Sequence, residues 1–368
     1  MTVTGMGEAG STEVALKLRA LLADLLETRD VMPGRRGSLR LRGRLRVPAE
    51  EAYALAAERV QPLGYTLFFR REGEDDVVHA VPHLPQPGPS RNWISLLLFA
   101  LTVLSAFWTG TAMEGWDLLR QGLPPDPLMG APFALTLMAI LLAHELAHYL
   151  AARHYGVPVS LPYFIPVPGT IFGTMGAIIR LKGPPRDRRA LLAVAMAGPL
   201  AGMAVALPLL VAGLSMSEVG PLPGGPGAFL EGNSLLYAGV KRLIFGRFLP
   251  GGGLDVLLHP MAFAAWGGLF VTGLNLIPAG QLDGGHIAYT LIGERARTLT
   301  LVVTAVLLIL GYFWPGWLLC AALCFLLGQF FAVPMNDITR LDRPRTLLAV
   351  LMLVLFALTF TPIPWTIT

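Results

Sequence analysis

The sequence predicts a polytopic α-helical membrane protein with a small soluble α+β domain at its N-terminus. Hydrophobic residues make up 54% of the 368 residues and charged residues only 14%, which is more apolar surface than one soluble core can bury. Apolar runs long enough to span a bilayer begin only after residue 90. Between two of these runs lies an apolar segment rich in Pro and Gly. Because its backbone cannot face lipid, we expect a re-entrant β-hairpin in addition to the helices.

The first 90 residues carry the pattern of a small mixed domain. Leucines at helical spacing extend through Glu13–Arg29, and Pro33-Gly34 then breaks the pattern. The elements expected after this break are a strand at Leu39–Arg42, a helix at Pro48–Val60, strands at Tyr65–Arg70 and Val77–Val81, and a proline-rich linker at Pro82–Ser90. We therefore expect residues 1–90 to form a soluble α+β domain with its linker, and residues 91–368 to form the membrane-embedded domain.

About seven apolar runs are candidates for transmembrane helices. They are Trp93–Met113, Ala131–Ala152, Ala190–Leu214, Pro260–Ile277, Leu299–Phe313, Trp317–Val333 and Thr346–Phe360. Arg91 precedes the first run and basic residues follow the second, whereas the loop between these two runs is mainly acidic. By the positive-inside rule, this pattern predicts a multi-pass protein of the cell membrane with its N-terminal domain in the cytoplasm. The second and fourth runs then point in the same direction.

Two further segments are apolar without being simple spans. For Tyr155–Pro185 we expect the re-entrant hairpin, and an interfacial loop that touches lipid headgroups stays open as an alternative. The stretch Glu231–Phe245 is too short and too polar to span, so we expect it to lie amphipathically at the outer interface.

Charge and cysteine content exclude some classes of protein. The net charge of +4 arises from Arg residues beside apolar runs, where they set topology and touch anionic lipid, so we expect the bilayer and no nucleic acid as a partner. Cys320 and Cys324 lie four residues apart in one apolar run without a second pair, which indicates neither a disulfide framework nor a thiolate metal site.

The second apolar run contains the sequence His144-Glu145-Leu146-Ala147-His148. Histidines at i and i+4 project from one helix face about 5–6 Å apart, so both can reach one zinc ion, and the intervening Glu145 can accept a proton from a water. An ionisable residue near mid-membrane costs roughly 2.5–3.5 kcal/mol, which a bound metal would offset. The alternative is a pair of histidines that only pack between helices.

A third protein ligand is expected from the end of the fourth run. Pro278 and Gly280 interrupt the helix there, and Asp283 follows at the depth that a span parallel to the second run would reach. The alternative for Asp283 is a helix cap in a turn. His154 lies on another face from His148 and is interpreted as interfacial.

These segments together resemble the site-2 protease family of intramembrane metalloproteases. The resemblance rests on His144–His148 in an apolar run and on the Asn-x-x-Pro-x-x-x-Leu-Asp-Gly-Gly pattern that begins at Asn275. Gly173–Ala177, Ala197–Gly202 and His259-Pro260 also look like landmarks of that family, so the match covers about residues 93–297. The small N-terminal domain, without a PDZ or CBS module, is similar to the plastid and cyanobacterial branch.

The resemblance implies a role for each motif residue. It implies one zinc ion held by His144, His148 and Asp283, with Glu145 as general base and acid. It also implies that Asn275 stabilises the oxyanion, although an amide that bridges two helices is an equally good reading of the residue alone. The implied substrates are transmembrane proteins, whose helix must unwind before cleavage. We expect the hairpin residues Gly173, Thr174 and Gly176 to bind the extended substrate by edge pairing.

Two other functions remain open at this point. Histidines and acids within spans also mark ion pathways, so a transporter of zinc or another ion is one alternative. A proteolytically silent scaffold that binds membrane proteins is another. Glu145 separates the protease from both, since neither a carrier site nor a scaffold needs it. Homo-oligomerisation also stays open.

Overall fold

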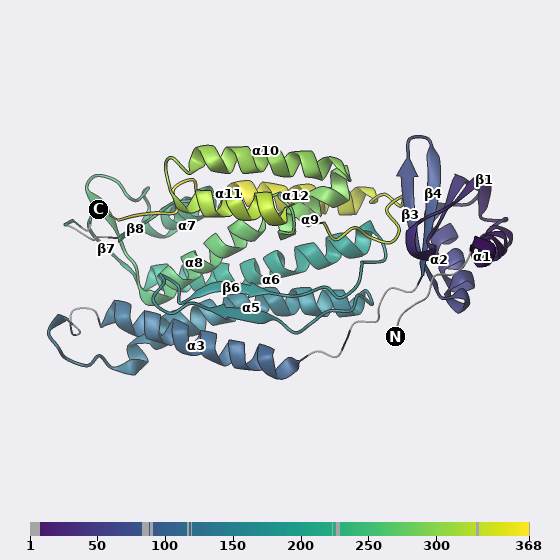
Figure 1. Ribbon diagram of the computed structural model, residues 1–368. Coiled ribbons are helices and arrows are strands. Elements are labelled where there is room, and N and C mark those ends of the chain that lie inside the picture. The colour runs from purple at the N-terminus through teal and green to yellow at the C-terminus, as the bar shows by residue number, and fades with distance from the viewer. Residues whose placement is uncertain are drawn as a thin grey trace. The chain divides into compact units, whose positions relative to one another are not determined.

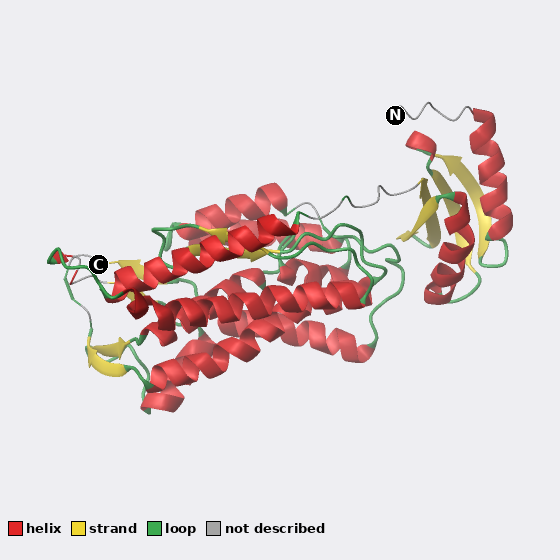
Figure 2. Cartoon of the chain, turned by 90° about the horizontal axis from the view of Figure 1, so that it is seen from below, coloured by secondary structure: helices red, strands yellow, loops and turns green. Residues whose placement is uncertain are grey.

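The computed structural model describes residues 8–82, 88, 91–115, 118, 120–222, 224–225, 229–328 and 331–367 (Figures 1 and 2). The chain forms two compact units. The N-terminal unit comprises Met1–Gly88, Gly183–Leu191 and Ala332–Asp342, and the helical unit comprises Pro89–Lys182, Leu192–Phe331 and Arg343–Thr368. The expected boundary at residue 90 stays a prediction, as does the linker Pro82–Ser90, most of which lies outside the described residues.

A four-stranded antiparallel sheet with two helices forms the N-terminal unit. The strands are ordered β1-β2-β4-β3. The elements are α1 (Glu8–Leu21), β1 (Leu26–Pro33), β2 (Leu39–Leu45), α2 (Ala49–Val60), β3 (Tyr65–Glu72) and β4 (Asp75–Pro82). Strands β3 and β4 are joined by a tight turn in which Gly73 has a φ of +64°, a conformation that favours glycine. The expected order of strand, helix, strand, strand after Pro33 is confirmed.

The leucine pattern of Glu13–Arg29 is helical only in part, so this prediction was wrong at its C-terminal end. Helix α1 ends at Leu21, and Leu26 already begins β1, where it pairs with Leu45 of β2. Leu18, Leu22 and Leu26 are all buried in one core, whichever element they belong to. The leucine spacing therefore indicates which residues are buried and does not distinguish a helix from a strand. The short turn between α1 and β1 places the leucines of both elements in the same core.

Two later segments complete the N-terminal unit at the edge strand β3. Phe69 of β3 donates its N–H to the carbonyl oxygen of Met335 (2.8 Å) and accepts from the N–H of Asp337 (3.1 Å). Asn336 is 2% exposed, and its N–H donates to the carbonyl oxygen of Arg186 (2.8 Å). The unit therefore combines the N-terminal residues with one segment before α6 and one before α12.

The helical unit contains a helix within each of the seven apolar runs. Its helices are α3 (Asn92–Glu114), α5 (Ala131–His154), α6 (Arg188–Ser215, which begins in the N-terminal unit), α7 (Leu235–Phe245), α8 (Pro260–Asn275), α9 (Asp283–Ile292), α10 (Arg295–Leu310), α11 (Gly316–Leu327) and α12 (Arg343–Thr359). Three of the described helices are long and apolar enough to cross a membrane, namely α3, α5 with its preceding turn, and α6. A membrane protein is thus supported, whereas the count of seven spans stays a prediction.

Helices α5 and α8 pack side by side and run in the same direction. The rings of Phe133 and Phe263 stack with centroids 6.0 Å apart near their N-terminal ends. Further along, a Cβ at Gly268 would lie 2.7 Å from the side chain of Ile140, so the glycine permits close approach. The contacts advance along both helices together, which confirms the parallel direction expected of these two runs.

The Pro/Gly-rich segment contains a β-hairpin. Strand β5 (Tyr163–Pro166) pairs antiparallel with β6 (Thr174–Ile178), with Tyr163 opposite Ile178. At the hairpin tip, the hydroxyl of Ser105 on α3 donates to the carbonyl oxygen of Gly173 (2.6 Å), which ties the hairpin to that helix. The position of this hairpin relative to a bilayer stays a prediction.

Short strands and α7 form the end of the helical unit where β7, β8 and the C-terminus lie (Figure 1). The strand pairs are β7 (Glu218–Pro221) with β9 (Leu254–Leu257) and β8 (Phe229–Glu231) with β10 (Trp365–Ile367). In helix α7, Lys241 is fully buried while Leu243 is 85% exposed. The amphipathic position expected for this segment at the outer interface stays a prediction. The ammonium of Lys241 lies 3.2 Å from Glu231 and 3.1 Å from Asp255. Burial raises the pKa of the Glu231 carboxyl, and Lys241 opposes that shift.

Candidate metal centre

The two histidines of the motif lie one turn apart on α5 and are buried. His144 is 3% exposed and His148 is 4% exposed. Their Nε2 atoms are 3.1 Å apart, because side chains at i and i+4 lie on the same face of a helix. The prediction that both imidazoles point to one position is therefore confirmed.

Helix α6 fixes the ring of His148 from behind. Nδ1 of His148 lies 2.7 Å from the carbonyl oxygen of Val194. Since a carbonyl oxygen only accepts, Nδ1 carries the proton, and in a neutral imidazole the Nε2 atom then keeps its lone pair. A Cβ at Gly198 would lie 2.0 Å from this Nε2, so only glycine leaves room for the ring. The sequence indicated Gly198 as a family landmark but gave no signal for Val194, whose backbone makes the contact.

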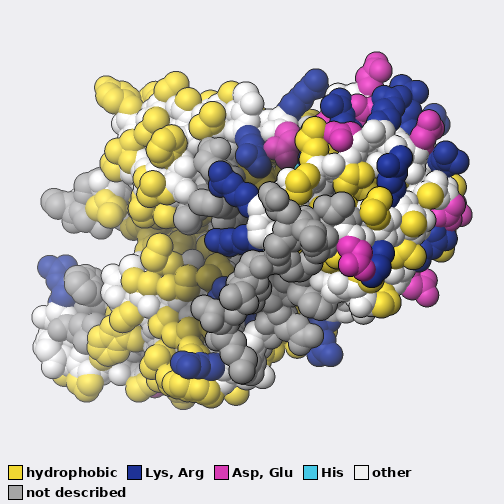
Figure 3. Space-filling view, turned by 45° about the vertical axis from the view of Figure 1, so that its right-hand side comes forward, with side chains coloured by type: hydrophobic (Ala, Val, Ile, Leu, Met, Phe, Trp, Pro, Cys, Tyr) yellow, Lys and Arg dark blue, Asp and Glu magenta, His cyan; other side chains and the backbone are white. Residues whose placement is uncertain are grey.

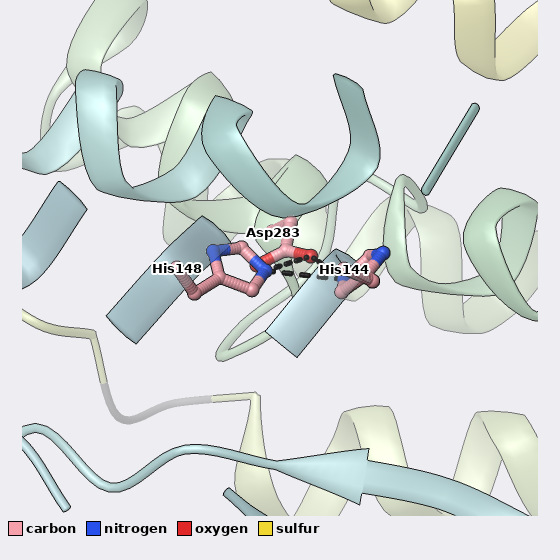
Figure 4. A group of neighbouring side chains, drawn as sticks. All are labelled: His144, His148 and Asp283. Atoms are coloured by element: carbon pink, nitrogen blue, oxygen red, sulfur yellow. Dashed lines mark hydrogen bonds and ion pairs between the residues drawn. The ribbon is translucent and has the colours of Figure 1, made fainter. Parts of the chain in front are cut away.

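Asp283 reaches the same position from the first turn of α9. Its Oδ2 atom lies 3.2 Å from Nε2 of His148 and 3.3 Å from Nε2 of His144 (Figure 4). Leu282 is the residue that caps α9, and the carboxylate of Asp283 is directed to the histidines. The helix-cap reading is therefore not supported. Helix α8 ends at Asn275, as the interruption by Pro278 predicts. The residues that follow place Asp283, the first residue of α9, beside the two histidines of α5.

The three groups fit a metal ion. Ligand atoms about 2.0–2.1 Å from a tetrahedral zinc ion lie roughly 3.3 Å from one another, and the observed separations are 3.1, 3.2 and 3.3 Å. A lone pair of His148 and a carboxylate oxygen would repel each other at this distance. A proton on Nε2 of one histidine still leaves the other histidine nitrogen facing the carboxylate oxygen, whereas a cation between the three atoms relieves all three close pairs. Among the described residues, these form the one group of His, Cys, Asp or Glu suited to a metal.

Glu145 and Asn275 flank this centre. Glu145 is 4% exposed and follows His144 directly on α5. The amide nitrogen of Asn275, the last residue of α8, lies 3.4 Å from Nε2 of His144. A metal ion at Nε2 would take the lone pair that this amide now contacts and would leave its N–H free for another acceptor. The geometry thus brings Asn275 to the site while both readings of its role stay open.

His286 follows Asp283 by three residues and is not one of the three converging groups. Its Nδ1 atom is buried and has no hydrogen-bond partner among the described residues.

The three expected substrate-binding residues lie in the hairpin. Thr174 is 6% exposed, and its hydroxyl accepts from the N–H of Gly176 (3.1 Å) and lies 2.9 Å from the carbonyl oxygen of Ile165. Gly173 has a φ of +69° and packs on α3, whereas a Cβ at Gly176 would meet only Val271 of α8, at 3.8 Å. Val271 precedes Asn275 by one turn, or about 6 Å along the axis. Thr174 thus holds the backbone of the hairpin. Gly176 of β6 lies beside Val271, one turn of α8 before Asn275.

An H-E-x-x-H helix completed by a distant carboxylate is an arrangement typical of metallopeptidases, and here the helix that carries it is long and apolar enough to cross a membrane. The model of peptidase family M50 matches residues 132–314, which include every residue of the centre. Over residues 132–314 the chain belongs to this family, the family of the site-2 proteases.

Several relatives are plant proteins. The chain is 32% identical over 325 residues to the probable zinc metalloprotease EGY2, chloroplastic, of Arabidopsis thaliana, covering 83% of this chain and 56% of the relative. It is 33% identical over 297 residues to the probable zinc metalloprotease EGY1, chloroplastic, of Oryza sativa subsp. japonica, covering 69% and 50%. The chain thus spans about half the length of the curated relatives it matches. No solved structure matches it.

Proposed function

We propose that this chain is an intramembrane zinc metalloprotease that hydrolyses peptide bonds of membrane-spanning proteins. The observation that carries this proposal is the convergence of His144, His148 and Asp283 within 3.3 Å of one another, with Glu145 buried beside them on an apolar helix. Relatives named as probable zinc metalloproteases support the choice of metal and of reaction. The proposal includes one zinc ion.

Each side chain has a task that follows from its chemistry. His144, His148 and Asp283 would hold the ion with three protein ligands, and a zinc ion so bound supplies Lewis acidity and an open position for water. Glu145 takes a proton from the attacking water and returns it to the leaving amine. The N–H of Asn275 donates to the oxygen that gains negative charge. Val194 and Gly198 keep His148 in one tautomer and one orientation.

The apolar helices around the site support a membrane-spanning protein as the substrate. A peptide bond inside a helix has its carbonyl hydrogen-bonded, so the substrate helix must unwind before attack. Strand β6 offers an extended partner, and its residues Met175 and Ile178 are 61% and 57% exposed. In the space-filling view, charged side chains gather over the N-terminal unit, whereas hydrophobic side chains outnumber charged ones on the visible face of the helical unit (Figure 3). An apolar substrate segment suits such a surface.

Strand pairing of the substrate is tested best at Met175 and Ile178. Substitution of Gly173 would disturb the fold itself, because a Cβ there would lie 2.7 Å from the backbone oxygen of Ser105. Met175→Glu and Ile178→Glu should lower cleavage of a transmembrane substrate with zinc content unchanged. Met216→Glu, at a residue that is 57% exposed beyond the end of α6, serves as the control. Equal cleavage by all variants would exclude this substrate-binding surface.

The decisive experiment compares wild type with Glu145→Gln. Both are purified in detergent with zinc and incubated with a single-span substrate, and wild type is also assayed after chelation and after zinc is restored. We expect cleavage only by zinc-loaded wild type, while Glu145→Gln keeps its zinc. Cleavage by the variant would refute the mechanism. Zinc flux in liposomes without any cleavage would instead establish the transporter.

The membrane that holds the protein is a further proposal. The relatives are named as chloroplastic, which favours a plastid membrane over the cell membrane that the sequence alone suggested. Fractionation of the native membranes with an antibody to the N-terminal unit would distinguish the two. A protease-protection assay would test the cytoplasmic side for that unit, and size analysis in detergent would test homo-oligomerisation.

A further inference from the structure

Thr300 of α10 holds the connection that delivers Asp283. Its side chain is fully buried. Its hydroxyl donates to the carbonyl oxygen of Ala296 on its own helix (2.9 Å) and accepts from the N–H of Gly280 (3.0 Å). Gly280 lies in the middle of residues 276–282, which join Asn275 at the end of α8 to Asp283 at the start of α9. One hydroxyl from a third helix is therefore bonded to the segment between two site residues.

The connection needs this acceptor because its own backbone does not supply one. The N–H of Ala279 donates to the carbonyl oxygen of Ile277 (2.7 Å), and that of Leu282 donates to Ala279 (3.2 Å). Pro278 has no N–H. Gly280 lies between these bonds with a φ of +52°, and its N–H is buried. A buried N–H without an acceptor costs about 1–3 kcal/mol, so loss of the hydroxyl would favour a shift of this segment.

A shift of Gly280 would reach Asp283 through close packing. A Cβ at Gly280 would lie 2.2 Å from Cα of Gly328 beyond the end of α11, so the segment is pressed against that helix on one side. On the other side, a Cβ at Gly285 would lie 2.3 Å from the carbonyl oxygen of Gly280. Gly285 belongs to the first turn of α9, two residues after Asp283. The backbone of Gly280 is thus enclosed between α11 and the turn that carries the carboxylate.

We propose that Thr300 is a positioning residue for the third metal ligand. It touches neither the metal position nor the substrate. By bonding Gly280, it keeps the start of α9 where Oδ2 of Asp283 lies 3.2 Å and 3.3 Å from the two histidine nitrogens. This inference rests on the proposed zinc site.

Thr304 is a matched control one turn further along α10. It is 6% exposed, and its hydroxyl donates to the carbonyl oxygen of Thr300 (2.8 Å), within the helix alone. Thr304→Val and Thr300→Val therefore remove the same hydroxyl from the same buried helix, but only Thr300→Val removes a bond to the connection. Thr300→Ser keeps the hydroxyl and removes a methyl group.

The experiment measures metal affinity of the full chain in detergent, by competition with a chromophoric chelator for zinc, and the visible spectrum of the cobalt-substituted protein. Thr300→Val should bind zinc about 10–100-fold more weakly than wild type and should change the cobalt spectrum. Thr304→Val and Thr300→Ser should match wild type in both. If Thr300→Val does not fold, Thr300→Cys takes its place with the same expectation, because a thiol is a weak acceptor.

The outcomes separate this inference from the proposed function. Wild-type affinity and spectrum in Thr300→Val, or equal losses in Thr300→Val and Thr304→Val, would overturn the role of Thr300 and leave the zinc site intact. Wild type that binds no zinc would overturn the zinc site and this inference with it.

Discussion

A methyl group at Gly198 would stand 2.0 Å from Nε2 of His148, although the two residues lie on different helices. The same helix α6 presents the carbonyl oxygen of Val194 to Nδ1 of that ring, at 2.7 Å. One helix thus determines both the protonation and the direction of a metal ligand on its neighbour. The position of the His148 ring therefore depends on the contact of α5 with α6.

Gly198→Ala should displace the ring of His148 and weaken metal binding. The displaced atoms belong to the imidazole itself and a ring cannot bend aside, so we expect a loss of about 10–100-fold in zinc affinity and a similar loss of cleavage. Zinc content after dialysis measures the first and a transmembrane substrate the second. Gly239→Ala on α7, where a Cβ would meet nothing within 4 Å, is the control and should keep both. Full zinc binding by Gly198→Ala would contradict the arrangement.

Asn275→Ala separates the two roles open to this amide. If its N–H donates to the oxyanion, kcat should fall about 10²–10³-fold, because removal of one such donor has this effect, while zinc affinity and melting temperature stay near those of wild type. If the amide only bridges α8 to His144 on α5, the melting temperature should fall and kcat should stay. We expect the first result. Steady-state kinetics and thermal unfolding of the same preparation decide between them.

The convergence of His144, His148 and Asp283 could be predicted from the sequence because each of these residues carries its own local signal. His144 and His148 are spaced at i and i+4, which places them on one helix face, and Asp283 follows the helix break at Pro278 and Gly280. The parallel direction of α5 and α8 followed from counting runs between charged loops. Each of these signals comes from side-chain type and spacing, which the sequence displays directly.

The supporting contacts could not be predicted because backbone atoms make them. Val194 acts through its carbonyl oxygen, and Met335 pairs with Phe69 through main-chain bonds, so the residue type at these positions does not indicate the contact. The helix expected at Glu13–Arg29 was too long for a related reason, since Leu26 is buried as a strand residue in the core that also holds Leu18. Burial alone does not distinguish these elements.

Asn336→Ala should destabilise the N-terminal unit. Its amide nitrogen donates to the carbonyl oxygen of Ala49 (3.0 Å) and to the hydroxyl of Thr339 (2.8 Å), and its amide oxygen accepts from the N–H groups of Ile338 and Thr339. With these partners left unpaired, unfolding should become easier by about 1–3 kcal/mol. Protection from limited proteolysis around residues 1–82 measures this.

The same contacts predict the behaviour of a fragment. Residues 1–90 expressed alone lack the segments 183–191 and 332–342 and should unfold more easily than the same residues in the full chain. Urea unfolding of the fragment, with and without a synthetic peptide of residues 332–342, tests this. A fragment as stable as the unit in the full chain would show that the later segments are dispensable.

Tyr53 should make the N-terminal unit sensitive to alkaline pH. The residue is 5% exposed, and burial raises the pKa of its hydroxyl from 10.0 to about 12. The folded state therefore keeps this proton where the unfolded chain has lost it. The stabilisation is complete below about pH 10 and declines as the pH rises from about 10 toward about 12, by roughly 2–3 kcal/mol in total.

Tyr53→Phe has no such proton, so its unfolding free energy should fall less steeply over the same range. Urea unfolding at a series of pH values, together with tyrosinate absorbance, tests the difference, and parallel curves for the two proteins would show that Tyr53 does not titrate as its burial requires.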